Sequence, residues 1–250
     1  TKVWLGREAN RALEEGVKNS GDTLNYTEMG SGGMQDSCEI YHTLRVPRGG
    51  EYTLVLADGT TVYLNAESEL RFPKQFKGKN RKVYLEGEGY FDVRRNEKQP
   101  FIVEAQQVAI RVLGTSFGVR AYTREVNVLT TLVQGRVNVE ADGQQVELNP
   151  GQQADFNRGK DRLTVAEVDV EQYVGWKDGR LVFDNKPLEF ILEELGRWYS
   201  FDVFYTNKEL KEIPYSLNIK KHEDIAHVLK LIERTGKVKF EVNKNMIIVK

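Results

Sequence analysis

The sequence predicts a mainly β protein, in which an antiparallel all-β unit is followed by a small α+β unit. Three observations lead to this fold class. Apolar residues alternate with a period of two through most of residues 45–170, and Gly or Pro separates short runs there. No amphipathic helix interrupts that region. Beyond Trp176 the composition shifts, and two apolar stripes with helical spacing appear between short strand-like runs.

Composition narrows the classes of function. The chain has 250 residues with 36 Lys and Arg against 37 Asp and Glu, a net charge of −1. This balance argues against a dedicated nucleic-acid-binding protein, which needs a basic excess. No apolar run approaches the roughly 18 residues of a membrane-spanning helix, and no leader pattern opens the chain. Cys38 is the single cysteine, so an intramolecular disulfide framework is excluded. Because the chain starts at Thr1 rather than Met, we expect a piece of a longer protein.

The first 45 residues are expected to be an approach segment. A short helical pattern covers Arg7–Val17, and residues 19–37 are rich in Gly, Ser, Asn and Asp with weak strand signals. This composition favours irregular structure over a packed unit.

The second segment, residues 46–173, is expected to form the all-β domain. Asp58-Gly59 and Asp142-Gly143 each lie between alternating apolar runs, which is a hairpin signal because both turn residues tolerate positive φ. The other predicted strands are 82–85, 90–94, 101–104, 108–113, 117–122 and 125–133. A sandwich, a jelly roll and a strand-coil stack all remain compatible with this pattern.

The third segment, residues 174–250, is expected to form an α+β domain of order β-α-β-β-α-β-β. Leu188, Ile191, Leu192 and Leu195 form one stripe of a helix over 187–199, and Pro187 suits its first turn. A second helix is predicted over 223–234, with Gly236 as its stop. The predicted strands are 181–183, 201–205, 215–219, 238–242 and 246–249.

Two sequence matches to enzyme motifs lack the structural context that those motifs require. Gly114–Gly118 matches the nucleophile elbow around Ser116, but a strand follows where that motif needs a helix. His222 and His227 are five residues apart, whereas a zinc-binding helix places two histidines four apart on one face. We therefore predict no catalytic, cofactor or metal site and expect a protein that is not an enzyme.

A carboxylate run motivates an alternative from a different class. Glu86, Glu88 and Asp92 share one face of a strand under period two. Paired carboxylates about 5 to 9 Å apart can hydrolyse glycosides. An extracellular glycan-binding or glycan-processing β protein is thus the alternative function, although alternating Glu and Gly is also typical of a solvated strand face.

Several blocks of sequence resemble the FecR domain of transmembrane anti-sigma regulators. They occur in order at Val46–Tyr52, Leu56–Thr60, Val62–Ser68, Leu85–Val93, Pro100–Val103, Val112–Val119, Leu132–Val137 and Leu148–Ala154. The tail from Trp176 to Val249 is similar to the domain that follows FecR in regulators of the Bacteroidota type, which is related to the short N-terminal domain of secretins and TonB-dependent transporters.

The resemblance implies a three-part protein with a cytoplasmic sigma-binding domain, one membrane span and a periplasmic sensor. This chain would be the periplasmic part, with residues 1–18 emerging from an absent transmembrane helix. Its implied partner is the signalling domain of a TonB-dependent outer-membrane transporter. An extracytoplasmic-function sigma factor would be bound only through the absent cytoplasmic domain, and no nucleic acid or cofactor is implied.

A partner could add a strand to an exposed sheet edge or dock on a helix face. The candidate surfaces are the closing hairpin and the first helix of the tail. Aromatic and Arg side chains dominate binding hot spots, although a core role for Trp198 remains open. The candidate partner-binding residues are Phe190, Arg197, Trp198, Val238, Phe240, Val242, Ile247 and Val249.

Overall fold

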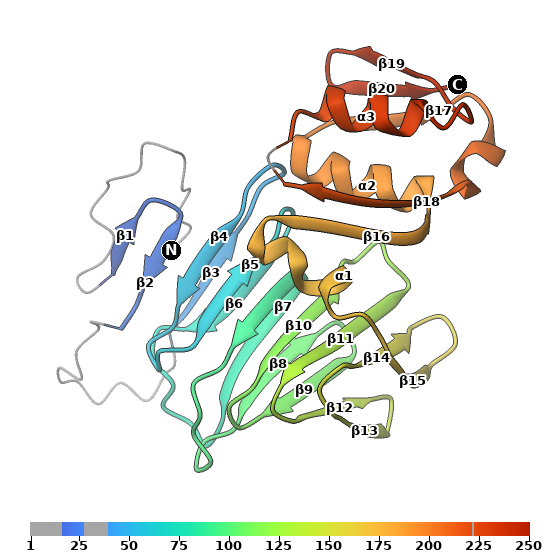
Figure 1. The fold of residues 1–250 in the computed structure, drawn as a ribbon. Helices are drawn as coiled ribbons and strands as arrows, with labels where there is room; N and C mark the ends of the chain where they lie inside the picture. Colours follow the sequence, from blue (N-terminus) through green and yellow to red (C-terminus); the bar gives the residue numbers. More distant parts are fainter. Residues whose placement is uncertain (1–16, 28–39, 222) are drawn as a thin grey trace. The chain divides into compact units, whose positions relative to one another are not determined.

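The computed structural model describes residues 17–27, 40–221 and 223–250 (Figure 1). The predicted helix over 7–17 and most of the expected approach segment fall outside these ranges. The described chain divides into two compact units. The first comprises residues up to Pro47 and Glu51–Val170, and the second comprises Arg48–Gly50 and Glu171–Lys250.

The described residues of the first unit form strands and no helix. Their bounds are β1 Lys18–Ser20, β2 Thr23–Asn25, β3 Tyr41–Arg45, β4 Tyr52–Val55, β5 Thr61–Leu64, β6 Glu69–Pro73, β7 Arg81–Asp92, β8 Phe101–Ala105, β9 Val108–Val112, β10 Ser116–Ala121, β11 Asn127–Gln134, β12 Val137–Ala141, β13 Gln144–Leu148, β14 Gln152–Asn157 and β15 Arg162–Glu167.

These strands form two branches that share β7. One branch runs β1-β2-β4-β5-β7-β10-β11-β14-β15, and the other runs β3-β6-β7-β8-β9-β12-β13. Pairing is antiparallel as predicted, except that β2 with β4 and β7 with β8 are parallel. Since residues of both branches line one hydrophobic core, the unit is a sandwich whose layers share a strand. Phe91 of β7 links them, with its ring 5.3 Å from that of Phe117 and 6.3 Å from that of Phe101.

Strand β7 corrects the sequence prediction of two separate runs, 82–85 and 90–94. Residues 81–86 pair with β6 and β8, whereas residues 87–92 pair with β5 and β10. The change of layer falls at Gly87, whose φ of +98° is open to glycine and rare for other residues. A Cβ there would lie 2.5 Å from Ser68 Oγ. Gly87 therefore bends the strand without ending it, whereas the sequence pattern alone indicates a break between two strands at this glycine.

The two Asp-Gly turns were predicted correctly. Asp142 and Gly143 have φ of +46° and +71° and join β12 to β13 in unshifted register. Asp58 and Gly59 join β4 to β5, and the Asp58 carboxylate accepts a bond of 3.0 Å from the Thr60 amide. Strands β3, β6, β14 and β15 were not among the predicted strands. The buried side chains of β6 are Leu70, Phe72 and Pro73, and β15 is exposed along most of its length.

The second unit has the predicted β-α-β-β-α-β-β order, preceded by two short helical turns. Its elements are α1 Glu171–Val174, the 3-10 turn η1 Gly175–Asp178, β16 Arg180–Pro187, α2 Leu188–Tyr199, β17 Asp202–Tyr205, η2 Lys208–Glu212, β18 Pro214–Lys220, α3 Ile225–Glu233, β19 Phe240–Asn243 and β20 Met246–Val249. The turns α1, η1 and η2 are too short to leave a periodic signal.

Two sheets enclose the two helices of this unit. Strands β16 and β18 form an antiparallel pair, and the second sheet has the order β17-β20-β19, with β17 parallel to β20 (Figure 1). Asp224 caps the start of helix α3, and its carboxylate accepts a bond of 2.9 Å from the Ala226 amide. Helix α2 buries Leu188, Ile191, Leu192 and Leu195 of its expected stripe, and α3 buries Val228, Leu229 and Ile232.

Candidate partner-binding surface

Four of the eight sequence-predicted partner-binding residues lie in the three-stranded sheet of the second unit, and a fifth, Val238, lies just before β19. Register places Val242 beside Ile247 and Phe240 beside Val249, so these four side chains share the face toward α3. Ile247 and Val249 are buried, as is Val238, which precedes β19. Val242 lies at the edge of that face and is 61% exposed. Of these residues, Val242 therefore presents the most accessible side chain.

The opposite face of the same sheet carries a second apolar group. Phe204 is 56% exposed, Met246 is 45% exposed, and Ile248 is half-buried beside Phe204. On the same face Glu241 forms an ion pair of 2.5 Å with Lys250. The sequence analysis missed Phe204 and Met246, although their position opposite to the half-buried Val203 and the buried Ile247 follows from strand alternation.

Strand β19 forms an edge of this sheet. Lys239 and Lys250 exchange two backbone hydrogen bonds of 2.9 Å, so the alternate residues Phe240 and Val242 direct their backbone groups away from β20. The Phe240 amide donates a bond of 2.7 Å to the Glu233 carboxylate of α3. Within the described ranges the outward amide of Val242 has no such partner. The edge is thus capped at its start and open at its centre.

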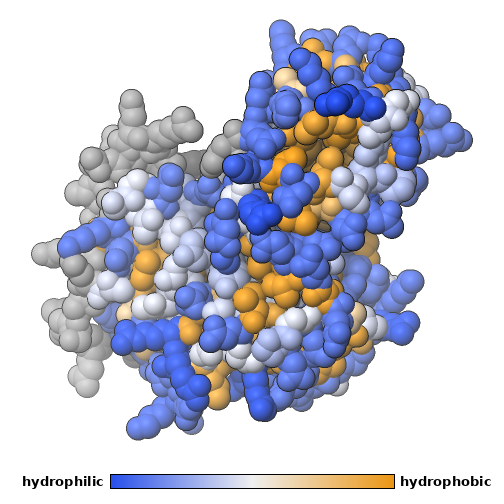
Figure 2. Space-filling view, viewed as in Figure 1, coloured by the Kyte–Doolittle hydropathy of each residue, from blue (hydrophilic) through white to orange (hydrophobic). Residues whose placement is uncertain are grey.

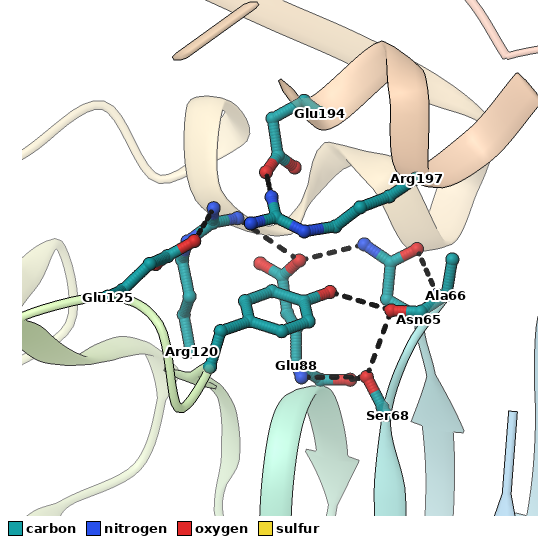
Figure 3. A network of polar contacts seen from close by, with 9 residues as sticks. Asn65, Ala66, Ser68, Glu88, Arg120, Glu125, Glu194 and Arg197 are labelled. Carbon is teal, nitrogen blue, oxygen red and sulfur yellow. Dashed lines mark hydrogen bonds and ion pairs between the residues drawn. The ribbon is translucent and has the colours of Figure 1, made fainter. Parts of the chain in front are cut away.

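The α2 candidates lie deeper. Phe190 is half-buried, with its ring 6.3 Å from that of Phe183. Arg197 is 9% exposed and pairs with Glu194 one helical turn away (Figure 3). Trp198 is 8% exposed and lies under the Lys221 ammonium at 4.3 Å. Figure 2 shows hydrophobic side chains over the α2 layer, surrounded by hydrophilic ones. Trp198 therefore occupies a core position, which is the alternative that the sequence analysis left open.

Two tyrosines of this unit are held in their neutral form. Burial and the carboxylates of Glu189 and Glu193 raise the pKa of Tyr205 far above its usual value. Burial, followed by the charges of Glu223 and Asp224, raises the pKa of Tyr199. A general base needs a pKa near the working pH, so neither hydroxyl suits proton transfer near neutrality.

A polar network occupies the bend of β7 in the first unit (Figure 3). Glu88 is buried and accepts a bond of 2.7 Å from the Asn65 amide, with the Arg120 guanidinium at 3.5 Å. Arg120 also donates two bonds, of 2.6 and 2.8 Å, to Glu125. Ser68 Oγ lies between the amide and the carbonyl of Glu88, at 2.8 and 3.1 Å. These contacts fix the backbone where the strand changes layers.

The network corrects the predicted carboxylate face. Glu86 is exposed and Glu88 is buried, so the two do not share a solvated face as alternation had indicated. Gly87 breaks the alternation between them. Asp92 is exposed and accepts a bond of 2.8 Å from Ser116 Oγ. Among the described large hydrophobic side chains that are exposed, Phe204 is the only aromatic one and lies in the other unit. This arrangement does not favour the glycan alternative.

The other motifs resolve as their context indicated. A strand, β10, follows Gly114, so Ser116 is not on a nucleophile elbow. His227 is exposed on α3, and His222 lies outside the described residues. In the ranges that the structure describes, no group of three His, Cys, Asp or Glu side chains could hold a metal ion. None of the helices in those ranges has the length and apolarity needed to cross a bilayer.

Family comparisons agree with this two-unit architecture. The FecR protein family model matches residues 42–138, and the model of the FecR C-terminal domain matches residues 180–249. The chain belongs to the FecR family. Two crystal structures of a candidate anti-sigma factor from Parabacteroides distasonis, at 1.65 and 2.50 Å resolution, resemble this FecR-family protein with a TM-score of 0.78 and 26% identity. The match covers 84% of this chain and 98% of that one.

No curated protein is significantly similar to the chain. The family and the matched structures together identify this FecR-family protein as an anti-sigma regulatory sensor. Its C-terminal family match begins at β16 and ends at β20, and so contains the open edge of β19.

Proposed function

We propose that this FecR-family protein is the periplasmic sensor part of an anti-sigma regulator, without enzymatic activity. It receives a signal from the N-terminal signalling domain of a TonB-dependent outer-membrane transporter. It relays that signal across the inner membrane to an extracytoplasmic-function sigma factor. In this proposal, a sigma-binding domain and a membrane span elsewhere in the regulator complete the relay.

One observation carries the proposal: the C-terminal family domain ends in a sheet with an open edge strand. Such an edge accepts a partner strand through backbone hydrogen bonds, while alternate side chains supply specificity. In β19, the outward amide and carbonyl of Val242 and the carbonyl of Phe240 are available for this pairing. We place the partner contact on Phe240 and Val242 of the hairpin and on Phe190 of α2. The buried candidates Val238, Ile247, Val249, Arg197 and Trp198 support these surfaces from the core.

The proposal is tested by isothermal calorimetry of the 250-residue protein with signalling domains from transporters encoded near it. We expect saturable binding to one such domain and none to the signalling domain of an unrelated system. Absence of binding to every neighbouring domain at concentrations that detect a Kd of about 0.1 mM would reject the transporter as the signal source.

The contact surface has its own test. Substitutions along residues 238–249 that leave transporter-domain affinity unchanged would exclude the closing hairpin. A Phe190→Ala variant tests the α2 face separately, because its half-buried ring packs against Phe183 of β16, which is not a strand of the three-stranded sheet.

A further inference from the structure

The open part of the β19 edge is short and has defined ends. Glu233 occupies the amide of Phe240, so an added strand cannot pair with that amide. Lys244 has φ of +53° and ends the strand on the other side. An incoming segment can therefore form a full pair of backbone bonds at Val242 and one further bond to the Phe240 carbonyl.

The side chains around this position define the residue that should lie opposite. Val242 is 61% exposed although its neighbour in register, Ile247, is 2% exposed. The face toward α3 is thus apolar but incompletely covered at its margin. An apolar side chain opposite Val242 would cover this surface, because directly opposed residues in antiparallel strands lie about 4.5 to 5.5 Å apart.

Charge decides between a second copy of this chain and a different partner. Lys239 and Lys244 flank the edge and are exposed, and neither forms an ion pair with any residue that the structure describes. Glu241 is neutralised by Lys250. In a symmetric pairing centred on Val242, Lys239 of one copy would lie opposite Asn245 of the other and Lys244 opposite Phe240, so neither lysine would meet an acidic residue and self-association gains no charge complementarity. Acidic residues at both ends of a partner segment would instead meet a lysine.

We propose that the β19 edge binds one extended segment of the partner, apolar opposite Val242 and acidic toward Lys239 and Lys244. This deepens the proposed function, on which it rests for the source of the segment. Glu233 sets the register, because it blocks Phe240 and leaves Val242 as the central pairing position.

The test uses fluorescein-labelled peptides of sequence DETVTED and KKTVTKK with the full chain, measured by fluorescence anisotropy. Both peptides read the same in either direction, so strand polarity does not affect the comparison. We expect DETVTED to bind at least tenfold more tightly at about 50 mM salt, with a smaller preference at about 500 mM. Equal affinities, or no binding of DETVTED up to 1 mM peptide, would overturn the proposal.

Matched variants separate backbone pairing from charge. Val242→Pro removes the pairing amide, while Val242→Thr keeps both the amide and a β-branched side chain. We expect at least a tenfold loss of DETVTED affinity for Val242→Pro relative to Val242→Thr, with unchanged circular dichroism. The double variant Lys239→Glu/Lys244→Glu should reverse the preference between the peptides. Equal binding by the two Val242 variants, or an unchanged preference in the double variant, would contradict the proposal.

Two further outcomes distinguish this proposal from the proposed function. A signalling domain that binds wild type and Val242→Pro equally rejects the edge site and leaves the transporter as signal source. Charge-selective peptide binding without binding of any signalling domain rejects that source and retains the edge site. Light scattering completes the set, since a dimer that dissociates in Val242→Pro would make a second copy the occupant and overturn the proposal.

Discussion

Replacement of Gly87 by alanine should destabilise the first unit strongly. The φ of +98° at this position costs a residue with a Cβ about 1 to 3 kcal/mol. The new Cβ would also lie 2.5 Å from Ser68 Oγ and 2.7 Å from Ser68 Cα, and overpacking of this kind costs about 1 to 3 kcal/mol more. We therefore expect Gly87→Ala to lower the free energy of unfolding by about 2 to 6 kcal/mol.

Gly151→Ala provides the matched control. Gly151 has a similar φ of +87°, but a Cβ there would meet no atom within 4 Å. Its loss should be limited to the conformational part, about 1 to 3 kcal/mol. Urea unfolding followed by far-UV circular dichroism measures both variants. Equal losses for Gly87→Ala and Gly151→Ala would refute the argument that the bend of β7 packs against Ser68.

Three further predictions concern single side chains. Arg81→Met should lower the free energy of unfolding in urea by about 3 to 5 kcal/mol, because Arg81 is buried and forms a 2.6 Å ion pair with Asp58. The control Arg136→Met, at an exposed ion pair, should lower it by under about 1 kcal/mol. Similar losses for the two variants would contradict this prediction. Burial raises the pKa of Asp155, so the fold loses stability as pH rises through that pKa and the carboxyl becomes charged. Asp155→Asn should therefore gain stability relative to wild type from pH 4 to pH 7. A difference in unfolding free energy between the two proteins that stays constant over this range would count against the prediction. Asp224→Ala should lower the stability of the second unit by about 0.5 to 2 kcal/mol through loss of the α3 cap. Thermal unfolding followed by Trp fluorescence measures this loss, and an unchanged transition would contradict the prediction.

The sequence predicted those features that depend on local chemistry. The turns at Asp58-Gly59 and Asp142-Gly143 follow from residues that tolerate positive φ, and the helix over 188–199 follows from its apolar stripe. The course of β7 was not predictable in this way. Its passage between layers depends on the contact of Gly87 with Ser68, nineteen positions away along the chain.

In the candidate partner-binding surface, too, the features set by local sequence were predicted and those set by distant residues were not. Alternation predicted that β19 and β20 would form a hairpin with one apolar face, and register confirms that pairing. The cap of Phe240 by Glu233 requires the position of α3 beside the edge, which no local pattern encodes. Similarly, the buried Glu88 looked like part of a solvated face, because its partners Asn65 and Arg120 come from distant strands.

The sharing of β7 by both layers has a consequence for how the first unit melts. Neither layer can separate while its half of that strand stays hydrogen-bonded, since the other half is continuous with it through Gly87. Loss of either layer therefore exposes the common phenylalanine cluster and removes support from the remaining one. A protease should accordingly find this unit either intact or wholly digestible, with no long-lived half-folded species.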